Sequence, residues 1–324
     1  MYDHPKFDYM AYNTLRMYDE RLARPENAVD PLWERIAGVI PHYQRRFGID
    51  GALIDMGHAL PEELKAILID RAHRIDEDFA FWDEAFEPSE RARSEGYSAV
   101  MGNLWWTLQR PERMREHVKR IESRGVVIPS LATPETHNTP RSAAREGGRL
   151  RSRLTWVLGA FLPSLPFVHS GFELGEIRPI NTGLDFSAEE IARHPTDRLG
   201  LYNAVAYDWA AAGEIVETIR RSLALRSRYA ALVTDQSAET IWTLELPDER
   251  LVGYARMGEL EAIVVIGLYG GPTRVAASPT VPLEDGAYID ALTGYRYRVE
   301  DGRTAVELEP WDVMLIHGRR PLVA

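Results

Sequence analysis

The alternation of short apolar segments with longer amphipathic ones restricts the possible folds of this chain most. Up to about Ala231, strand-like apolar segments lie at residues 51–57, 78–86, 98–106, 126–132 and 165–171. Segments with apolar residues at helical spacing, such as 111–124, separate them. Strands that alternate with helices predict βα units and a parallel sheet.

The pattern of predicted secondary structure changes after Ala231. Short β-rich segments follow one another there, separated by turn pairs such as Gly270-Gly271 and Asp285-Gly286. This pattern is typical of a small antiparallel sandwich. We therefore predict two domains, an α/β domain over residues 1–232 and a β-sandwich domain over residues 233–324.

Composition excludes several classes of protein. The net charge of −11 argues against a nucleic-acid partner, because a general grip on phosphate needs clustered Lys and Arg. The absence of cysteine excludes disulfides, thiolate catalysis and cysteine metal sites. No apolar run reaches the roughly 18 residues of a membrane span. The N-terminal MYDHPKFDYM lacks a signal-peptide pattern, so we expect a cytoplasmic protein without a membrane partner.

Two carboxylates follow successive predicted strands, Asp55 after the first and Glu84 after the second. Neighbouring parallel strands lie about 4.8 Å apart, so these side chains can face each other at the carboxyl end of the sheet. A retaining glycosidase needs two carboxyls about 5–5.5 Å apart. Phe81, Trp82 and Phe86 near Glu84 favour a raised pKa for an acid catalyst. Each residue taken alone is more often the N-cap of the next helix, and together they favour a site.

Six segments in order carry a resemblance to a known family. The segments are GALIDMGHALP (51–61), FWDEAF (81–86), TPETHNTPR (133–141), LPFVHSGFELGE (165–176), IRRSLALRSRYAAL (219–232) and LEPWDVMLIHG (308–318). They resemble the segments of the α-amylase family, glycoside hydrolase family thirteen, from barrel strand four to the last strand of the C-terminal domain. The variants DMGHALP and THNTPR resemble most the maltosyltransferase-like members that act on α-1,4-glucans.

The resemblance implies a role for each matched residue. Asp55 would be the nucleophile that forms a covalent glycosyl-enzyme, and Glu84 the general acid and base. His137 would bond hydroxyls of the sugar at the cleavage point. His58 stands where family members often carry a lysine that contacts the next sugar, although an ordinary loop histidine is an equal alternative. The substrate would be an α-glucan or maltooligosaccharide, and no cofactor or metal is expected.

Two tryptophans leave a choice open. Trp105 and the adjacent Trp106 can stack on sugar rings as substrate-binding residues, but core packing is the expected use of at least one of them.

Three departures from the family pattern affect these expectations. Leu53 stands where an arginine normally supports the nucleophile, and Asn138 replaces the third catalytic carboxylate. Glu135, three residues before Asn138, is a candidate substitute. The segments of strands one to three are missing, so the resemblance predicts an incomplete (β/α)₈ TIM-type barrel, with strands four to eight, before the sandwich. Either a partner chain supplies the missing strands or the chain is a truncated product, which we favour.

Two functions remain as hypotheses. The first is a retaining α-glucan hydrolase or glycosyl transferase that acts by double displacement. The second is a catalytically silent glucan-binding or interaction protein, because the loss of the arginine and of the third carboxylate would lower turnover more than ground-state binding.

Overall fold

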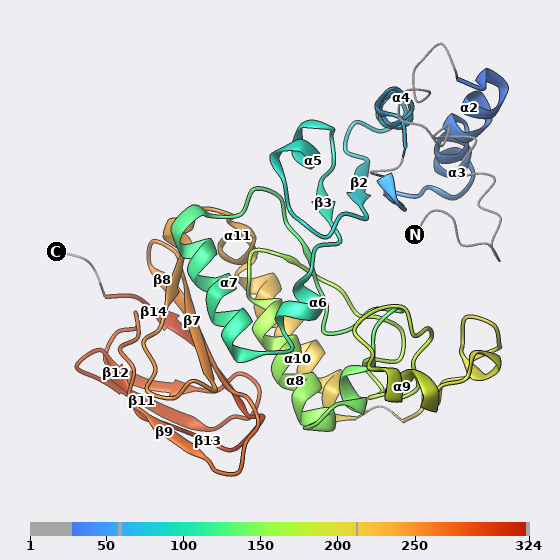
Figure 1. The fold of residues 1–324 in the computed structure, drawn as a ribbon. Helices are drawn as coiled ribbons and strands as arrows, with labels where there is room; N and C mark the ends of the chain where they lie inside the picture. Colours follow the sequence, from blue (N-terminus) through green and yellow to red (C-terminus); the bar gives the residue numbers. More distant parts are fainter. Residues whose placement is uncertain (1–27, 58–59, 212, 322–324) are drawn as a thin grey trace. The chain divides into compact units, whose positions relative to one another are not determined.

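The computed structural model describes residues 28–57, 60–211 and 213–321. These residues form two compact units (Figure 1). Among the described residues, the N-terminal unit contains residues 28–57, 60–102 and 127–130, and the C-terminal unit contains residues 103–126, 131–211 and 213–321. This division falls inside the predicted barrel, and the predicted domain boundary at residue 232 stays a prediction.

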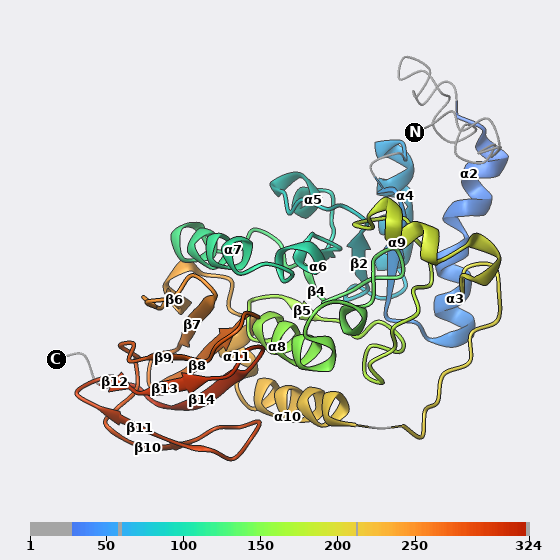
Figure 2. The same cartoon turned by 60° about the horizontal axis from the view of Figure 1, so that its bottom comes forward.

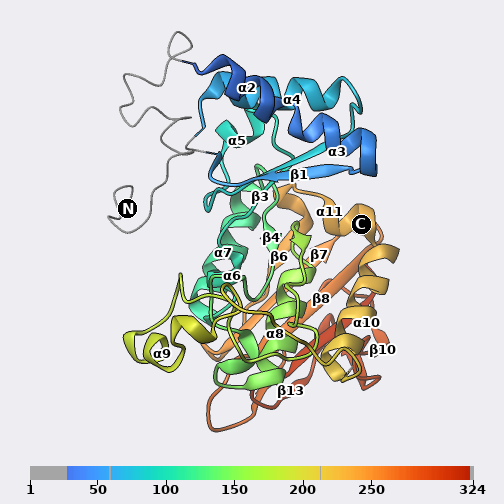
Figure 3. The same cartoon turned by 90° about the vertical axis from the view of Figure 1, so that its right-hand side faces the viewer.

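The N-terminal unit is a parallel three-stranded sheet with helices. Its strands, in the order β1-β2-β3, are β1 (Gly51–Ile54), β2 (Ala80–Asp83) and β3 (Ala99–Val100), and a parallel bridge joins Val100 to Ser130. Its helices are α2 (Asp30–Ala37), α3 (Val39–Phe47), α4 (Glu62–His73) and α5 (Glu90–Ser94). Helix α4 packs beside α2 and α3 (Figure 3). The core of the unit contains Ile54, Leu64, Leu68, Phe81 and Val100.

The predicted strand at residues 98–106 is only partly correct. Strand β3 is two residues long, and residues Leu104–Thr107 form the short helix α6. Gly102 adopts a φ of +65°, a left-handed conformation that an extended strand cannot continue through. Buried apolar residues such as Leu104 fit a helix as well as a strand, so the apolar run alone did not distinguish the two.

The C-terminal unit contains a second parallel strand pair, which α6 and α8 (Gly148–Ala160) contact. Strands β4 (Leu131–Ala132) and β5 (Leu165–Pro166) pair in parallel. The helices are α7 (Pro111–Arg124), α8 (Gly148–Ala160), α9 (Ala188–Arg193), α10 (Glu214–Arg228) and α11 (Ala230–Thr234), with short 3₁₀ turns at Ser142–Ala144, Thr196–Arg198 and Ala238–Thr240. Helices α8 and α10 lie side by side (Figure 2).

The rest of this unit is antiparallel β structure. Its main sheet has the order β14-β8-β7-β6, built from β6 (Ile241–Thr243), β7 (Leu251–Met257), β8 (Glu261–Leu268) and β14 (Val313–Arg319). The smaller sheets pair β10 (Gly286–Ile289), β11 (Arg296–Glu300) and β12 (Arg303–Thr304), and β9 (Val275–Ala277) with β13 (Val306–Leu308).

Helix α8 packs directly on the main sheet. A Cβ atom at Gly267 of β8 would lie 2.2 Å from the Leu154 side chain of α8, so only glycine permits this approach. One hydrophobic core therefore contains Leu154 and Trp156 of α8 together with Tyr254 and Val265 of the sheet. The helices and the antiparallel sheet of this unit are packed as one body.

Candidate active site

Asp55 and Glu84 follow two strands that pair in register. Ile54 at the end of β1 is opposite Asp83 at the end of β2, and the Glu84 N–H donates to the Ile54 carbonyl at 3.2 Å. Because the strands are parallel, the residue after each strand emerges at the same edge of the sheet. The structure thus brings the two carboxyl groups together, as the sequence predicted; their chemical roles stay proposals.

The two carboxyl groups are held by a hydrogen bond between them. Glu84 Oε2 also accepts the Met56 backbone N–H at 2.9 Å. Burial is the largest influence on Glu84, and with the Asp55 hydrogen bond and the charges of Asp55 and Asp83 it raises the pKa of the Glu84 carboxyl, against the lowering effect of the Met56 N–H. A carboxyl with a raised pKa is suited to hold a proton and to donate it as a general acid.

The backbone next to Asp55 is strained. Met56 has a φ of +49°, in the left-handed region that side chains other than Asn, Asp and Gly seldom adopt. The same residue directs its N–H onto Glu84. Non-glycine residues in such conformations cluster at functional sites, where the surrounding structure holds them in place. The strained turn therefore joins the backbone that follows Asp55 to the Glu84 carboxyl.

Gly57 and Asp83 support this turn, and the sequence analysis did not single them out. A Cβ atom at Gly57 would lie 2.5 Å from Asp83 Oδ1 and 2.8 Å from the Tyr97 hydroxyl oxygen. Asp83 and Tyr97 are both buried. The glycine two residues after Asp55 was a usable signal, because a loop that crosses a buried polar side chain this closely excludes any Cβ.

Leu53 lies where family members carry an arginine. It is 47% exposed on β1 and has Trp82 as its strand partner. Residues two apart on a strand point to the same face, which places Leu53 on the side of Asp55. An apolar side chain there provides no positive charge to the carboxyl pair.

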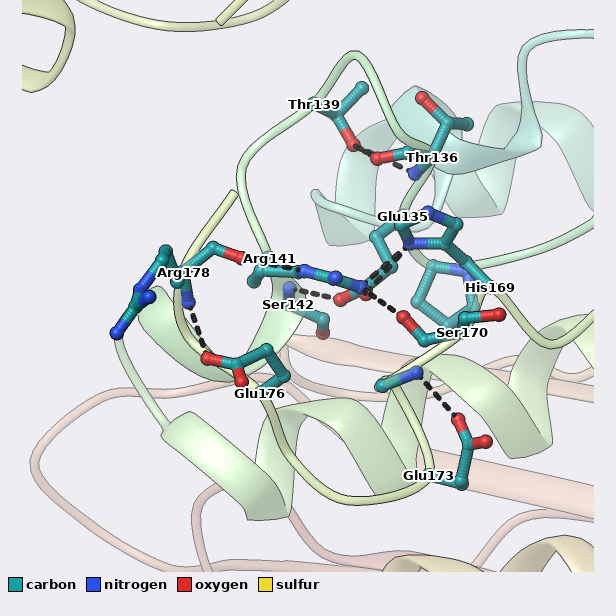
Figure 4. Close-up of polar contacts among 12 residues, drawn as sticks. Glu135, Thr136, Thr139, Arg141, Ser142, His169, Ser170, Glu173, Glu176 and Arg178 are labelled. Atoms are coloured by element: carbon teal, nitrogen blue, oxygen red, sulfur yellow. Dashed lines mark hydrogen bonds and ion pairs between the residues drawn. The ribbon is translucent and has the colours of Figure 1, made fainter. Parts of the chain in front are cut away.

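Glu135 is buried in the C-terminal unit, where Arg141 and Ser142 bind its carboxylate (Figure 4). Its side chain is 1% exposed, and Oε1 lies 2.6 Å from the Arg141 Nη1 atom. Oε2 accepts the Ser142 backbone N–H at 2.6 Å. His169 Nδ1 lies 3.3 Å from Oε1. Both carboxylate oxygens accept hydrogen bonds from groups of the protein, and the expected contact of Glu135 with substrate stays a prediction.

Arg141 connects this carboxylate to other segments. Its guanidinium also donates to the carbonyls of Ser170 and Arg178 and to the Tyr207 hydroxyl. The side chain is fully buried. Arg141 is part of the TPETHNTPR segment, but no spacing rule predicts its role, because its buried network depends on partners that only the fold brings near.

The other predicted residues of the C-terminal unit have different environments. His137 is exposed. Asn138 is half-buried, and its Oδ1 accepts a hydrogen bond from the Asn181 side chain at 2.8 Å. Trp105 is only 9% exposed, which fits the core packing expected of at least one of the two tryptophans, and its contact with sugar stays a prediction. Trp106 is 39% exposed and has the Arg113 guanidinium 3.2 Å from its ring centroid.

His58 lies outside the described residues. Among the described residues, no group of three or more His, Asp and Glu side chains has an arrangement able to hold a metal ion. Within the same residues, every helix is too short or too polar to cross a membrane.

Comparison with known proteins gives a clear result only at the level of structure. No protein-family model matches the chain, and no curated protein sequence is similar enough to match it. Among solved structures, an Anoxybacillus α-amylase matches with a TM-score of 0.66 and 15% identity, over 91% of this chain and 64% of that one. The Geobacillus thermoleovorans α-amylase in complex with acarbose matches with a TM-score of 0.68 and 13% identity, over 91% of this chain and 65% of that one. The chain has an α-amylase fold.

A cyclomaltodextrin glucanotransferase shares this fold with a TM-score of 0.67 and 16% identity, over 89% of this chain and 60% of that one. The α-amylase fold confirms the predicted fold class, a partial barrel followed by an antiparallel β domain. The chain spans only about two thirds of the length of the α-amylases it matches. The TM-scores establish the fold, whereas sequence identities this low do not establish the function. The function must therefore be argued from the site.

Proposed function

We propose that this chain carries the catalytic pair of a retaining α-glucan-active enzyme, with Asp55 as the nucleophile and Glu84 as the general acid and base. The observation that carries this proposal is the hydrogen-bonded pair at the ends of β1 and β2, in which the pKa of Glu84 is raised. The fold it shares with α-amylases and a glucanotransferase supports an α-glucan as substrate.

The proposed reaction has two displacements. Protonated Glu84 gives its proton to the leaving glycosidic oxygen while ionised Asp55 forms a bond to the anomeric carbon. Glu84, now ionised, then takes a proton from water or from a sugar hydroxyl, which attacks the anomeric carbon and releases Asp55. The hydrogen bond between the two carboxyls breaks when the glycosidic oxygen takes the place of Asp55 beside Glu84. Water as acceptor gives hydrolysis, and a sugar as acceptor gives transfer.

A product analysis with maltoheptaose tests this function. We expect shorter oligomers alone from hydrolysis, or both shorter and longer oligomers from transfer. Glu84→Gln should lower turnover by about 10²–10⁴-fold, which is the usual contribution of general acid–base catalysis. Asp55→Asn should abolish the covalent step. Glu63→Gln, an exposed carboxylate on α4, is the matched control and should keep full turnover.

The proposal fails if the wild-type chain leaves maltoheptaose unchanged, or if Glu84→Gln and Glu63→Gln have equal turnover.

A glucan-binding protein without turnover is the second candidate. The observation that favours it is the pair of neutral side chains where the family has charged ones: exposed Leu53, and Asn138 with its amide oxygen already bonded to Asn181. Calorimetry that detects maltoheptaose binding in a chain with no measurable turnover would support this candidate over the first.

A further inference from the structure

A cavity of about 360 Å³ lies in the C-terminal unit, and none of its lining residues is assigned above to catalysis. The turn before β11, the segment after β13 and the α8 side chain of Arg153 line it. Its size falls within the range of small-ligand pockets, which is about 300–1,000 Å³. All of its lining residues belong to one compact unit.

One wall of the cavity is aromatic. Tyr295 is 64% exposed, and its ring centroid lies 4.9 Å from that of Tyr297 with the ring planes at 62°. The edge-to-face contact holds the exposed ring by its neighbour. A large aromatic side chain left this accessible, at the wall of a cavity, offers an apolar surface that a ligand can cover.

Trp311 is a third aromatic residue of the same cavity, and its ring is fixed. Its φ of +72° is exceptional for a bulky residue. A Cβ atom at Gly147 or Gly270 would lie 2.5 or 2.6 Å from the indole ring, and the Arg151 guanidinium is 5.1 Å from the ring centroid. The Trp311 ring is therefore held in place before any ligand arrives, which reduces the entropy cost of binding against it.

The rim of the cavity is polar and has unused hydrogen-bonding capacity. Asp312 Oδ2 accepts the Glu309 backbone N–H, whereas the Glu309 carboxylate has no hydrogen-bond or ion-pair partner among the described residues. Arg274 pairs with Glu307 at 2.9 Å, and both side chains are more than half exposed. Acceptors and donors thus stand around the aromatic wall.

The charges of the lining select the class of ligand. Two arginines, Arg153 and Arg274, face four acidic residues, which gives a net charge of −2 and disfavours phosphates and other anions. Most of the acidic groups are already engaged: Asp290 accepts backbone N–H groups, and Glu307 is paired with Arg274. A bare cation would therefore find one open carboxylate, that of Glu309, in a lining that also contains two arginines.

A pyranose ring fits this chemistry better than an ion. It is neutral, its axial C–H bonds present an apolar face to an aromatic ring, and its hydroxyls at the edge both donate and accept hydrogen bonds. We propose that the cavity walled by Tyr295, Tyr297 and Trp311 is a second carbohydrate-binding site, which holds a neutral oligosaccharide. The choice of an α-1,4-glucan as the occupant rests on the proposed function; the site itself rests on the cavity.

Calorimetric titration of the full chain with maltoheptaose tests the site, in the Glu84→Gln background so that turnover does not intervene. Loss of the stacking ring in Tyr295→Ala should weaken binding about tenfold or more, since an aromatic contact of this kind contributes of the order of 1.4 kcal/mol. Tyr295→Phe keeps the ring and should bind within about threefold of the parent. Tyr202→Ala removes an equally exposed tyrosine (60%) outside the cavity and should change nothing.

Choline chloride and cellohexaose complete the design. Choline binding that requires Tyr295, without maltoheptaose binding, overturns the carbohydrate assignment in favour of a cation site. Cellohexaose that binds more tightly than maltoheptaose overturns the α-glucan assignment. Maltoheptaose affinity that is equal in the parent and in Tyr295→Ala overturns the site altogether.

The outcome is separable from that of the proposed function. Turnover by the wild-type chain with no effect of Tyr295→Ala on affinity removes only the second site. Binding that depends on Tyr295 in a chain without turnover supports the second site and removes only the catalytic proposal.

Discussion

Glu84 and Glu135 each follow a strand of a parallel pair, β2 and β4, yet the charges around the two carboxyl groups are of opposite sign. Glu84 stands beside Asp55 in the N-terminal unit, half exposed, with a second negative charge from Asp83 nearby. Glu135 is buried in the C-terminal unit against the Arg141 guanidinium, with the Ser142 N–H on its other oxygen. Like charges surround the first carboxylate, and compensating groups surround the second.

The comparison shows what each arrangement is able to do. A carboxyl with uncompensated neighbours of the same sign holds its proton more tightly and is ready to give it to a substrate. A buried carboxylate bonded through both oxygens to a guanidinium and a backbone N–H is shielded from solvent, and these bonds tie Glu135 to Arg141 and Ser142 on either side of His137 and Asn138 along the chain. Both residues follow a strand. The neighbouring charges distinguish Glu84, a candidate catalytic residue, from Glu135, a structural residue.

The largest expected effect comes from removing one member of the compensated pair. Arg141→Met would leave the fully buried Glu135 carboxylate without its counter-charge, and the loss of one partner of a buried pair costs about 3–5 kcal/mol. Urea unfolding of both proteins measures this loss. Arg220→Met breaks an exposed pair with Glu217 and should leave the urea-unfolding midpoint nearly unchanged.

The double variant Glu135→Leu, Arg141→Met sharpens the test. Replacement of both members of a buried pair by apolar residues should recover much of the loss. A double variant no more stable than Arg141→Met would mean that the other bonds of the guanidinium, to Ser170, Arg178 and Tyr207, account for the effect.

The backbone N–H of Ser142, which donates to Glu135, is a single donor of the same network that a substitution can remove. Ser142→Pro deletes the N–H that bonds Glu135 together with the Ser142 hydroxyl. Residue 142 begins a 3₁₀ turn and Arg141 before it has a ψ of 138°, a backbone that a following proline tolerates. A hydrogen bond to a charged group contributes about 1.5–3 kcal/mol, and we expect a loss of that size in urea unfolding. Ser142→Ala keeps the N–H and removes a hydroxyl that has no partner among the described residues. Equal losses in both variants would contradict the role of the N–H.

Local patterns predicted those features that depend on local interactions. Helix α7 begins at Pro111 and ends at Arg124, just as predicted, because proline and the following Gly125 mark its two ends in the sequence. The closeness of Asp55 and Glu84 also followed from pattern, since parallel strands in register put the residues after them at one edge.

Other features depend on contacts that the sequence does not encode locally. The burial of Glu135 requires Arg141, whose further partners Ser170, Arg178 and Tyr207 come from a distant part of the chain. Trp105 is buried although its neighbour Trp106 is exposed, a choice made by which face of the short helix α6 meets the core. Burial of a polar or aromatic residue is a tertiary property, and no spacing rule reveals it.

A positive charge placed beside Asp55 and Glu84 would give these carboxyl groups a counter-charge, as Arg141 gives Glu135. Leu53→Arg puts a guanidinium on the face of β1 that carries Asp55, at a position already 47% exposed. It should favour ionised Asp55 as nucleophile, and we expect turnover of maltoheptaose to rise about tenfold, equivalent to roughly 1.4 kcal/mol. Leu53→Gln, of similar length and without charge, is the control. A rate equal in both variants would show that charge at residue 53 does not limit the reaction.

The smallest expected effect is the change in folding stability on Glu84→Gln. Its sign distinguishes a carboxyl among like charges, such as Glu84, from one with a counter-charge, such as Glu135. The pKa of Glu84 is raised in the folded protein, so the folded state holds this proton more tightly than the unfolded chain. That contribution to folding is complete below the ordinary glutamate pKa of about 4.3 and is lost as the pH rises through the folded-state value. Glu84→Gln removes the charge, so it should stabilise the protein at pH 7.5 and leave stability unchanged near pH 4.

The size of this difference is limited by solvent. Glu84 is partly exposed, so screening should hold the gain at pH 7.5 below about 1 kcal/mol, or a few degrees in Tm. Thermal unfolding from pH 4 to 8 measures it, with Glu63→Gln as the matched control. Asp55→Asn should shift Tm in the same direction, because it removes the other charge of the same pair, and the double variant should gain less than the sum of the two. A lower Tm for Glu84→Gln at pH 7.5 would place Glu84 with Glu135, as a carboxylate whose charge the fold compensates.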